Sequence, residues 1–336
     1  MAAAIDTHVH VIVPELLRST AAGEDWRPRV WREDGAQVVE LGGKEIRSAV
    51  GELVAVDEIL ADRRRIGIDG VVLSPWVPLL YPDAEAAACL ERCRLQNEGL
   101  EHIVGANPGR VAALGAVPMQ KPELAAAELA ALRRRGVLAG VEVAASVGGA
   151  FLGEESFEEF WAVAEESAAI VFVHPTTRGF EAPVFQRHYL WNTVGNPLET
   201  TIAAAQMVMA GVLERHPDLV VVLAHGGGAL LSVAGRLSHS HGFQPAARAD
   251  LGESPLDSIR RFHFDTVTHS EPLLRGLIEQ VGIERVLLGS DHPFDMADPD
   301  PVGSVASLGL DEEAEAAILG ANARRLLRRS VPDPSP

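Results

Sequence analysis

Hydrophobic and polar positions along this chain follow two alternating patterns. Short runs rich in β-branched and other apolar residues are each followed by a longer stretch rich in alanine, leucine, glutamate and arginine. The short runs predict eight strands, namely Ala4–His10, Gly70–Ser74, Val111–Val117, Gly140–Val143, Ile170–His174, Leu219–His225, Phe262–Thr266 and Arg285–Gly289. The longer stretches predict helices at Glu85–Asn107, Pro122–Arg135, Phe157–Ser167, Glu199–Arg215, Glu271–Val281 and Asp311–Leu327.

Strands that alternate with helices predict parallel pairing through crossover helices. An open doubly wound sheet and a closed (β/α)8 barrel both satisfy this alternation. No glycine-rich nucleotide-binding motif follows the first predicted strand, which argues against the open sheet. The length of 336 residues suits a single barrel. We therefore predict one α/β domain over residues 1–336, a (β/α)8 TIM barrel.

Two long segments interrupt the alternation. The first, residues 13–52, is inserted after strand one and contains Trp26, Trp31 and the sequence GGKEIR. The second, residues 176–197, follows strand five. Both leave the carboxyl end of a predicted strand, where TIM barrels build their active sites, and loops this long are usually functional. The tail SVPDPSP, residues 330–336, is expected to be frayed.

The charge balance limits the possible partners. With 29 basic and 47 acidic residues the formal net charge is -18, and no basic block is present. This argues against nucleic acid or an anionic membrane as a partner. No run approaches the roughly 18 apolar residues of a membrane helix, and no signal peptide is evident, so we expect a cytoplasmic protein. The two cysteines, Cys89 and Cys93, share a helix face and predict packed thiols more than a metal site.

The sequence Asp6-Thr7-His8-Val9-His10 carries the clearest chemical signal. Residues i and i+2 of a strand point the same way, so His8 and His10 project together into the barrel. Two imidazoles on one face suit zinc or a similar divalent metal. An isolated pair of this kind would also be compatible with a polar strand face, but this pair is accompanied by others.

Three further predicted strands lead to a potential ligand or proton carrier. His174 ends IVFVHP, His225 ends the apolar part of LVVVLAHGGG, and Asp291 follows in RVLLGSDHP. A barrel brings such strand ends together at one site. We predict that His8, His10, His174 and Asp291 bind one divalent metal, with zinc favoured, and that His225 moves a proton beside it.

The lysines bear on the number of metal ions. Only Lys44 and Lys121 are present, and neither lies in a predicted strand, which excludes a two-metal site bridged by a modified strand lysine. Glu142, in GVEVAAS, is an alternative bridging residue. Its position is explained more simply as a polar residue of the barrel interior, so one metal is favoured.

These motifs resemble a known family. DTHVH, FVHP, LAHGGG and LLGSDHPF, in this order and at these distances, resemble the amidohydrolase superfamily. The narrower resemblance is to its branch that contains 2-amino-3-carboxymuconate-6-semialdehyde decarboxylase, and LGAVPMQKPELA, VGNPLETTIAAAQMVMAGVLERHPDL and AHGGGALLSVAGRLSH share it. The resemblance covers most of residues 6–327 and weakens in 18–40, 77–85 and 246–255.

The resemblance implies a role for each matching position. The four predicted ligands fall on zinc ligands of the family, and His225 falls on its acid/base histidine. Arg47 falls on an arginine that holds a substrate carboxylate, and Trp191 on an aromatic residue that lines the substrate pocket. Arg236 falls on an arginine that reaches the active site of the neighbouring subunit, which implies a homodimer. Two arginines would hold a small anionic substrate in a protein of net charge -18.

The expected activity is non-oxidative decarboxylation of a small unsaturated or aromatic carboxylic acid. An alternative is a hydrolase or hydratase that uses the same metal and base on a lactone, an amide or an unsaturated diacid. A non-catalytic metal-binding scaffold is disfavoured by the intact ligand set and by His225. Two departures put the substrate in question: His292 replaces a usual aromatic residue, and the segment SPWVPLLYPDA after strand two differs.

Overall fold

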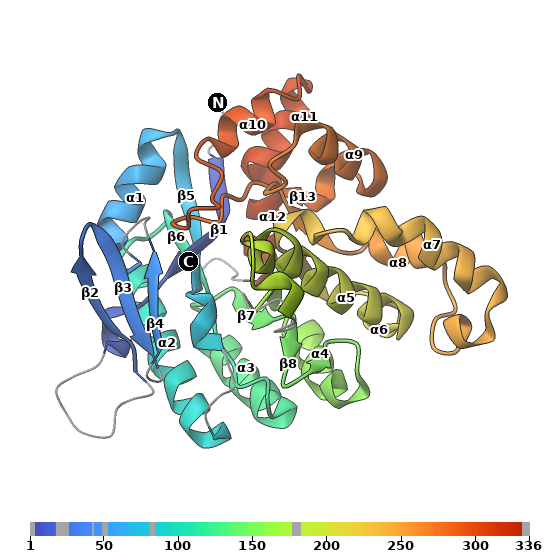
Figure 1. The fold of residues 1–336 in the computed structure, drawn as a ribbon, viewed down its shortest axis with the longest axis horizontal. Helices are drawn as coiled ribbons and strands as arrows, with labels where there is room; N and C mark the ends of the chain where they lie inside the picture. The colour runs from blue at the N-terminus through green and yellow to red at the C-terminus, as the bar shows by residue number, and fades with distance from the viewer. Residues whose placement is uncertain are drawn as a thin grey trace, which may run out of the picture.

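Eight parallel strands form a barrel at the centre of the molecule (Figure 1). The computed structural model describes residues 4–17, 27–41, 44–48, 53–80, 85–176 and 183–330. Every predicted strand is confirmed, with ends that differ by a few residues. In the order of the sheet they are β1 (Ala4–Val11), β5 (Ile68–Pro75), β6 (Val111–Gly115), β7 (Gly140–Ala144), β10 (Ile170–His174), β11 (Val220–Leu223), β12 (His263–Asp265) and β13 (Val286–Leu287).

The sheet closes where the chain following β13 returns to β1. The backbone N–H of Thr7 donates to the Leu288 carbonyl at 2.8 Å, and that of Asp291 donates to the His8 carbonyl at 2.9 Å. The closure confirms the (β/α)8 TIM barrel. It also places Asp291 beside the first-strand histidines, although these residues lie at opposite ends of the sequence.

Four of the predicted helices are present nearly as expected: α2 (Ala86–Ala106), α3 (Pro122–Arg135), α4 (Glu158–Glu166) and α9 (Glu271–Val281). The helix predicted over Glu199–Arg215 is instead two helices, α5 (Asn196–Met209) and α6 (Val212–Arg215). The break lies at Gly211, whose φ of 68° is left-handed and where a Cβ would lie 2.3 Å from the Asp250 carbonyl oxygen. Glycine is therefore required at this turn.

Other helices were not predicted, or are interrupted. The unpredicted ones are α1 (Val56–Arg65), α7 (Leu230–Phe243), α8 (Pro255–Ile259) and α10 (Pro301–Ala306). The C-terminal helix is divided into α11 (Glu312–Ala316), a π-helical turn (Ala317–Ala321) and α12 (Asn322–Ser330). Within the described parts of the chain, no helix is both long and apolar enough to cross a membrane.

The segment inserted after strand one contains a small antiparallel sheet. Its strands are β2 (Arg29–Glu33), β3 (Ala36–Leu41) and β4 (Lys44–Ser48), which lie to one side of the barrel in Figure 1. The insertion is therefore more than a long loop. Trp26 and the predicted tail after Ser330 lie outside the described residues, as do residues 177–182 of the second long segment.

The amino end of the barrel is filled with apolar side chains. Leu114, Ile170, Val222 and Leu287 from four strands pack with Leu326 of α12. Since Ile170 begins β10 and α12 follows the last strand, this helix closes the amino end of the barrel. The polar strand residues gather at the other end.

The two cysteines are buried free thiols on α2, packed with Leu80 and Ala116. This agrees with the expectation of packed thiols.

Candidate metal centre

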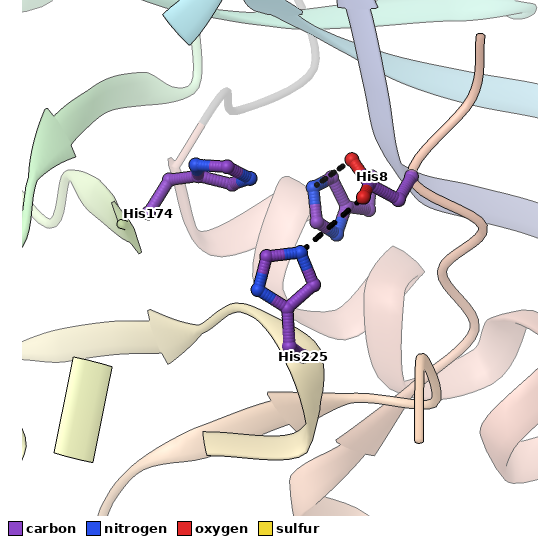
Figure 2. Close-up of side chains that lie close together, drawn as sticks. His8, His174 and His225 are labelled. Carbon is purple, nitrogen blue, oxygen red and sulfur yellow. Dashed lines mark hydrogen bonds and ion pairs between the residues drawn. The ribbon is translucent and has the colours of Figure 1, made fainter. Parts of the chain in front are cut away.

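The four predicted metal ligands meet at the carboxyl end of the barrel. The Nε2 atoms of His8 and His10 lie 3.0 Å apart. Asp291 Oδ1 lies 3.2 Å from His8 Nε2 and 3.3 Å from His10 Nε2. His174, the last residue of β10, joins His8, His225 and Asp291 in a group whose potential ligand atoms all lie within 4.8 Å of one another. Figure 2 shows the rings of His8, His174 and His225 turned toward one another.

Hydrogen bonds on the far side of each ring fix where its proton lies. Each Nδ1 has an oxygen acceptor: Asp265 for His8 at 2.7 Å, the Pro75 carbonyl for His10 at 2.9 Å, and the Pro175 carbonyl for His174 at 2.8 Å. A proton held on Nδ1 leaves the Nε2 lone pair free, which is the arrangement found around metal-bound histidines.

Electron-pair donors therefore converge in a buried space. His8 and His10 are fully buried and Asp291 is 6% exposed. His174 Nε2 and Asp291 Oδ1 are buried without a hydrogen-bond partner among the described residues. Buried acceptors that face one another without a donor are unfavourable unless a cation lies between them. Three nitrogens and one carboxylate oxygen fit a divalent metal.

The electrostatics of the group agree with this arrangement. Burial alone would lower the pKa of His8, but the Asp291 and Asp265 carboxylates raise it to about 10. Burial lowers the pKa values of His10 and His174. Burial opposes ionisation of Asp291, but the charge of His8 and the close contacts with His10 and His225 hold its pKa well below the usual range. Burial thus favours neutral His10 and His174 beside a negative Asp291, and the carboxylates that raise the pKa of His8 would equally favour a metal cation in place of its Nε2 proton.

His225 lies beside this group and faces a cavity. It follows β11 in a short turn with a left-handed φ of 57°. Its Nε2 lies 3.3 Å from Asp291 Oδ2, and its Nδ1 has no hydrogen-bond partner among the described residues. The side chain is 16% exposed, so it can contact a bound molecule as well as Asp291.

A cavity of about 510 Å³ opens next to His225 and Asp291, large enough for a small organic molecule. Its lining comes from the turn before α5, from α7 and from α9, and includes Asn192, Asn196, Leu231, Leu277 and Met296. No arginine is among the described residues that line it.

None of the three predicted substrate-binding residues lines this cavity. Arg47, on β4, is half exposed and forms an ion pair with Glu33 of β2. Trp191 packs edge to face against Tyr189 at 5.0 Å, and its neighbour Asn192, not Trp191 itself, lines the cavity. Arg236 is exposed on α7. The structure of one chain therefore brings none of the three into contact with the histidine group.

Glu142, on β7, is a further buried carboxylate next to the candidate ligands. It is fully buried, neither carboxylate oxygen has a hydrogen-bond partner among the described residues, and its Oε1 lies 3.8 Å from His10 Nδ1. Burial raises its pKa well above the usual range. Glu142 also groups with His10 and His174 as potential ligands. However, both imidazoles donate from Nδ1 to carbonyl oxygens, so each has only one nitrogen to offer.

His292 does not line the cavity either. Its carbonyl accepts a hydrogen bond from the backbone of His10 at 2.8 Å. Burial, followed by the positive charge of Arg63, lowers the pKa of His292 to about 4. This position therefore carries a neutral, packed imidazole.

Two carboxylates that support the site, those of Asp265 and Glu199, are not predictable from the motifs alone. Asp265 accepts the Nδ1 proton of His8. It is the last residue of β12 and the last but one of the predicted strand Phe262–Thr266, so it carried nearly the same signal as His174. Glu199 accepts hydrogen bonds from Ser146 Oγ at 2.5 Å and from the Thr176 backbone at 2.8 Å, which holds the loop after His174. An acidic residue in the first turn of a helix is ordinary, so Glu199 could not be singled out from its sequence position.

Comparison with known proteins places this arrangement in a family. The sequence profile of the Amidohydrolase family matches residues 5–329. The chain is 30% identical over 290 residues to 2-amino-3-carboxymuconate-6-semialdehyde decarboxylase of Dictyostelium discoideum, covering 85% of this chain and 80% of that protein.

Solved structures show the same fold. 5-Carboxyvanillate decarboxylase from Sphingomonas paucimobilis superimposes with a TM-score of 0.80 at 25% identity, covering 98% of this chain and 99% of the other. Dihydroxybenzoic acid decarboxylase from Polaromonas, whose structure contains bound manganese, gives a TM-score of 0.79 at 20% identity, over 98% and 97%. The chain therefore belongs to the amidohydrolase family, in the branch of 2-amino-3-carboxymuconate-6-semialdehyde decarboxylase.

Proposed function

We propose that the protein is a metal-dependent, non-oxidative decarboxylase of a small unsaturated or aromatic carboxylic acid. The observation that carries the proposal is the position of His225, which is beside the candidate metal ligands and also faces the cavity. The branch to which the chain belongs and the decarboxylases of similar fold support the reaction class.

His8, His10, His174 and Asp291 would hold the metal, and their donor atoms suit a single divalent ion. When bound, the ion would supply positive charge that polarises a substrate oxygen conjugated to the carboxylate. Zinc is the ion that the family resemblance implies, while manganese is the ion in the Polaromonas structure. We propose zinc.

His225 would supply the proton. Loss of CO2 breaks a carbon–carbon bond and leaves its electron pair on the substrate carbon, conjugated to an electron-accepting group. A proton from His225 would then form the new C–H bond, and solvent would return a proton to the imidazole. The exposed edge of His225 on the cavity supports this role.

Substrate binding would need residues from outside the cavity of one chain. We propose that Arg47 holds a substrate carboxylate and exchanges its Glu33 partner for it. Arg236 is exposed on α7 and has no ion pair within the described residues, which suits a role in the site of a partner subunit. We therefore propose a homodimer in which Trp191 lies beside the substrate. We also propose that the protein is cytoplasmic.

The test is CO2 release by the purified protein loaded with zinc or with manganese. The substrates are 2-amino-3-carboxymuconate semialdehyde, 5-carboxyvanillate and a dihydroxybenzoate. We expect release from at least one of them, its loss on chelation, and its loss in His225→Ala that still binds metal. Turnover of a lactone, amide or unsaturated diacid without CO2 release would contradict decarboxylation and support the hydrolase or hydratase alternative.

A further inference from the structure

The Asp265 carboxylate accepts hydrogen bonds from both parts of the site, the candidate ligand His8 and the turn at His225. Asp265 ends β12 and is fully buried. Its Oδ2 accepts from His8 Nδ1 at 2.7 Å and from the His225 backbone N–H at 2.9 Å. Its Oδ1 accepts from the backbone N–H of Gly226 at 2.8 Å and of Val267 at 3.1 Å. One carboxylate thus contacts a candidate ligand and the turn that carries the proposed proton donor.

The turn at His225 needs such support. His225 and Gly226 have φ values of 57° and 59°, in the left-handed region. A residue other than glycine costs roughly 1–2 kcal/mol there, and persists only where its surroundings hold it. The N–H groups of both residues point to Asp265, so its carboxylate opposes relaxation of the turn. The direction of the turn decides whether His225 reaches Asp291 and the cavity.

The hydrogen bond between Asp265 and His8 concerns the candidate metal ligand. A carboxylate that accepts the Nδ1 proton fixes the tautomer and the ring plane of His8, and makes its Nε2 a stronger electron-pair donor. His10 and His174 rely on neutral carbonyl oxygens for the same purpose. His8 is therefore the imidazole whose donor strength depends on a negative charge.

We propose that Asp265 is a positioning residue that sets two groups at once, His8 as a metal ligand and His225 as the proton donor. Metal affinity and proton transfer are thereby coupled through one buried side chain. The second half rests on the proposed function, whereas the first does not.

The test compares Asp265→Asn and Asp265→Glu with the wild type. Asparagine keeps the shape but loses the charge and one acceptor, so the backbone N–H groups and His8 compete for a single oxygen. Metal affinity is measured by competition with a chromogenic zinc chelator, and ligand geometry by the visible spectrum of the cobalt-substituted protein. We expect Asp265→Asn to weaken zinc binding about 10- to 100-fold and to change the cobalt spectrum.

The kinetic readout separates positioning from substrate binding. At saturating metal, kcat of Asp265→Asn should fall about 10- to 100-fold with KM unchanged, because the turn at His225 relaxes. Asp265→Glu keeps the charge and should recover part of the zinc affinity. Glu128→Gln is the matched control, since Glu128 is also buried but lies on α3 and pairs with Arg94. It should bind zinc as the wild type does.

The outcomes are distinguishable. Zinc affinity within about threefold of the wild type in both Asp265 variants would overturn the inference, whatever their activity. If Asp265→Asn does not fold, Asp265→Glu decides the question. Zinc affinity and a cobalt spectrum equal to those of the wild type would then overturn the inference, and partial loss of affinity would support it. A weakened metal site together with no decarboxylation by the wild type would leave the role toward His8 standing and reject the proposed function.

Discussion

The two ends of the barrel are made by the same strands but have opposite chemistry. In β10, Ile170 belongs to the apolar cluster under α12, and His174, four residues later, belongs to the candidate metal centre. The amino end gains stability from apolar area removed from water, which requires no particular partner atom. At the carboxyl end each buried nitrogen and oxygen needs its own partner. Changes at the amino end should therefore alter stability without altering the metal chemistry at the carboxyl end.

Replacing Asp291 should have the largest effect. Its carboxylate lies within 3.3 Å of nitrogens on three histidines, so Asp291→Ala removes the shared negative charge of the centre. We expect loss of bound metal and a fall in turnover of at least about 1000-fold. Metal content by elemental analysis, together with initial rates, measures both effects. A variant that keeps one metal per chain would contradict the assignment of Asp291 as a ligand.

Replacing His225 should separate proton transfer from metal binding. With His225→Ala we expect kcat to fall about 100- to 10000-fold while the metal content stays the same. His225 also lies within 4.8 Å of the other potential ligand atoms. Loss of the metal in this variant would therefore make His225 a ligand and would leave the proton to another group.

A change at the amino end should affect stability alone. Leu114 is 2% exposed in the apolar cluster. Leu114→Ala should lower the free energy of unfolding by about 2–5 kcal/mol, through lost burial and a residual cavity. Denaturant unfolding measures this loss. The kcat of the folded variant should equal that of the wild type, and a change in metal affinity would show that the two ends are coupled.

The smallest effect is expected at Glu142. Burial raises the pKa of Glu142 well above the usual range, which favours the neutral carboxyl group that the amide of Glu142→Gln closely replaces. We expect one metal per chain, as in the wild type, and little change in rate. The observation that would reverse this view is a second metal ion in the wild type that Glu142→Gln loses.

The barrel strands were predictable because their signal is local: a short apolar run that ends in a polar residue. The insertion sheet was missed even though Asp34-Gly35, with left-handed φ values of 51° and 79°, is a common turn between paired strands. Helix α1 was missed because charged residues dominate its sequence, VDEILADRRR, and hide its apolar face.

The site was predictable only in part, for a related reason. Strand-end histidines and Asp291 were found because spacing and strand position bring them together. The role of Asp265 depends on which side chains face one another across a closed barrel, and sequence spacing does not show that. The ion pair of Arg47 with Glu33 likewise depends on pairing within a sheet that was not predicted.

The left-handed backbone at the functional residues has a consequence for how this protein can evolve. His225 and Asp291, with φ values of 57° and 64°, occupy conformations that glycine adopts without strain. Glycine would relieve this strain at either position but would remove the imidazole or the carboxylate that the proposed reaction needs. Backbone strain of roughly 1–2 kcal/mol at each of these two residues is thus a cost in stability that accompanies the active site.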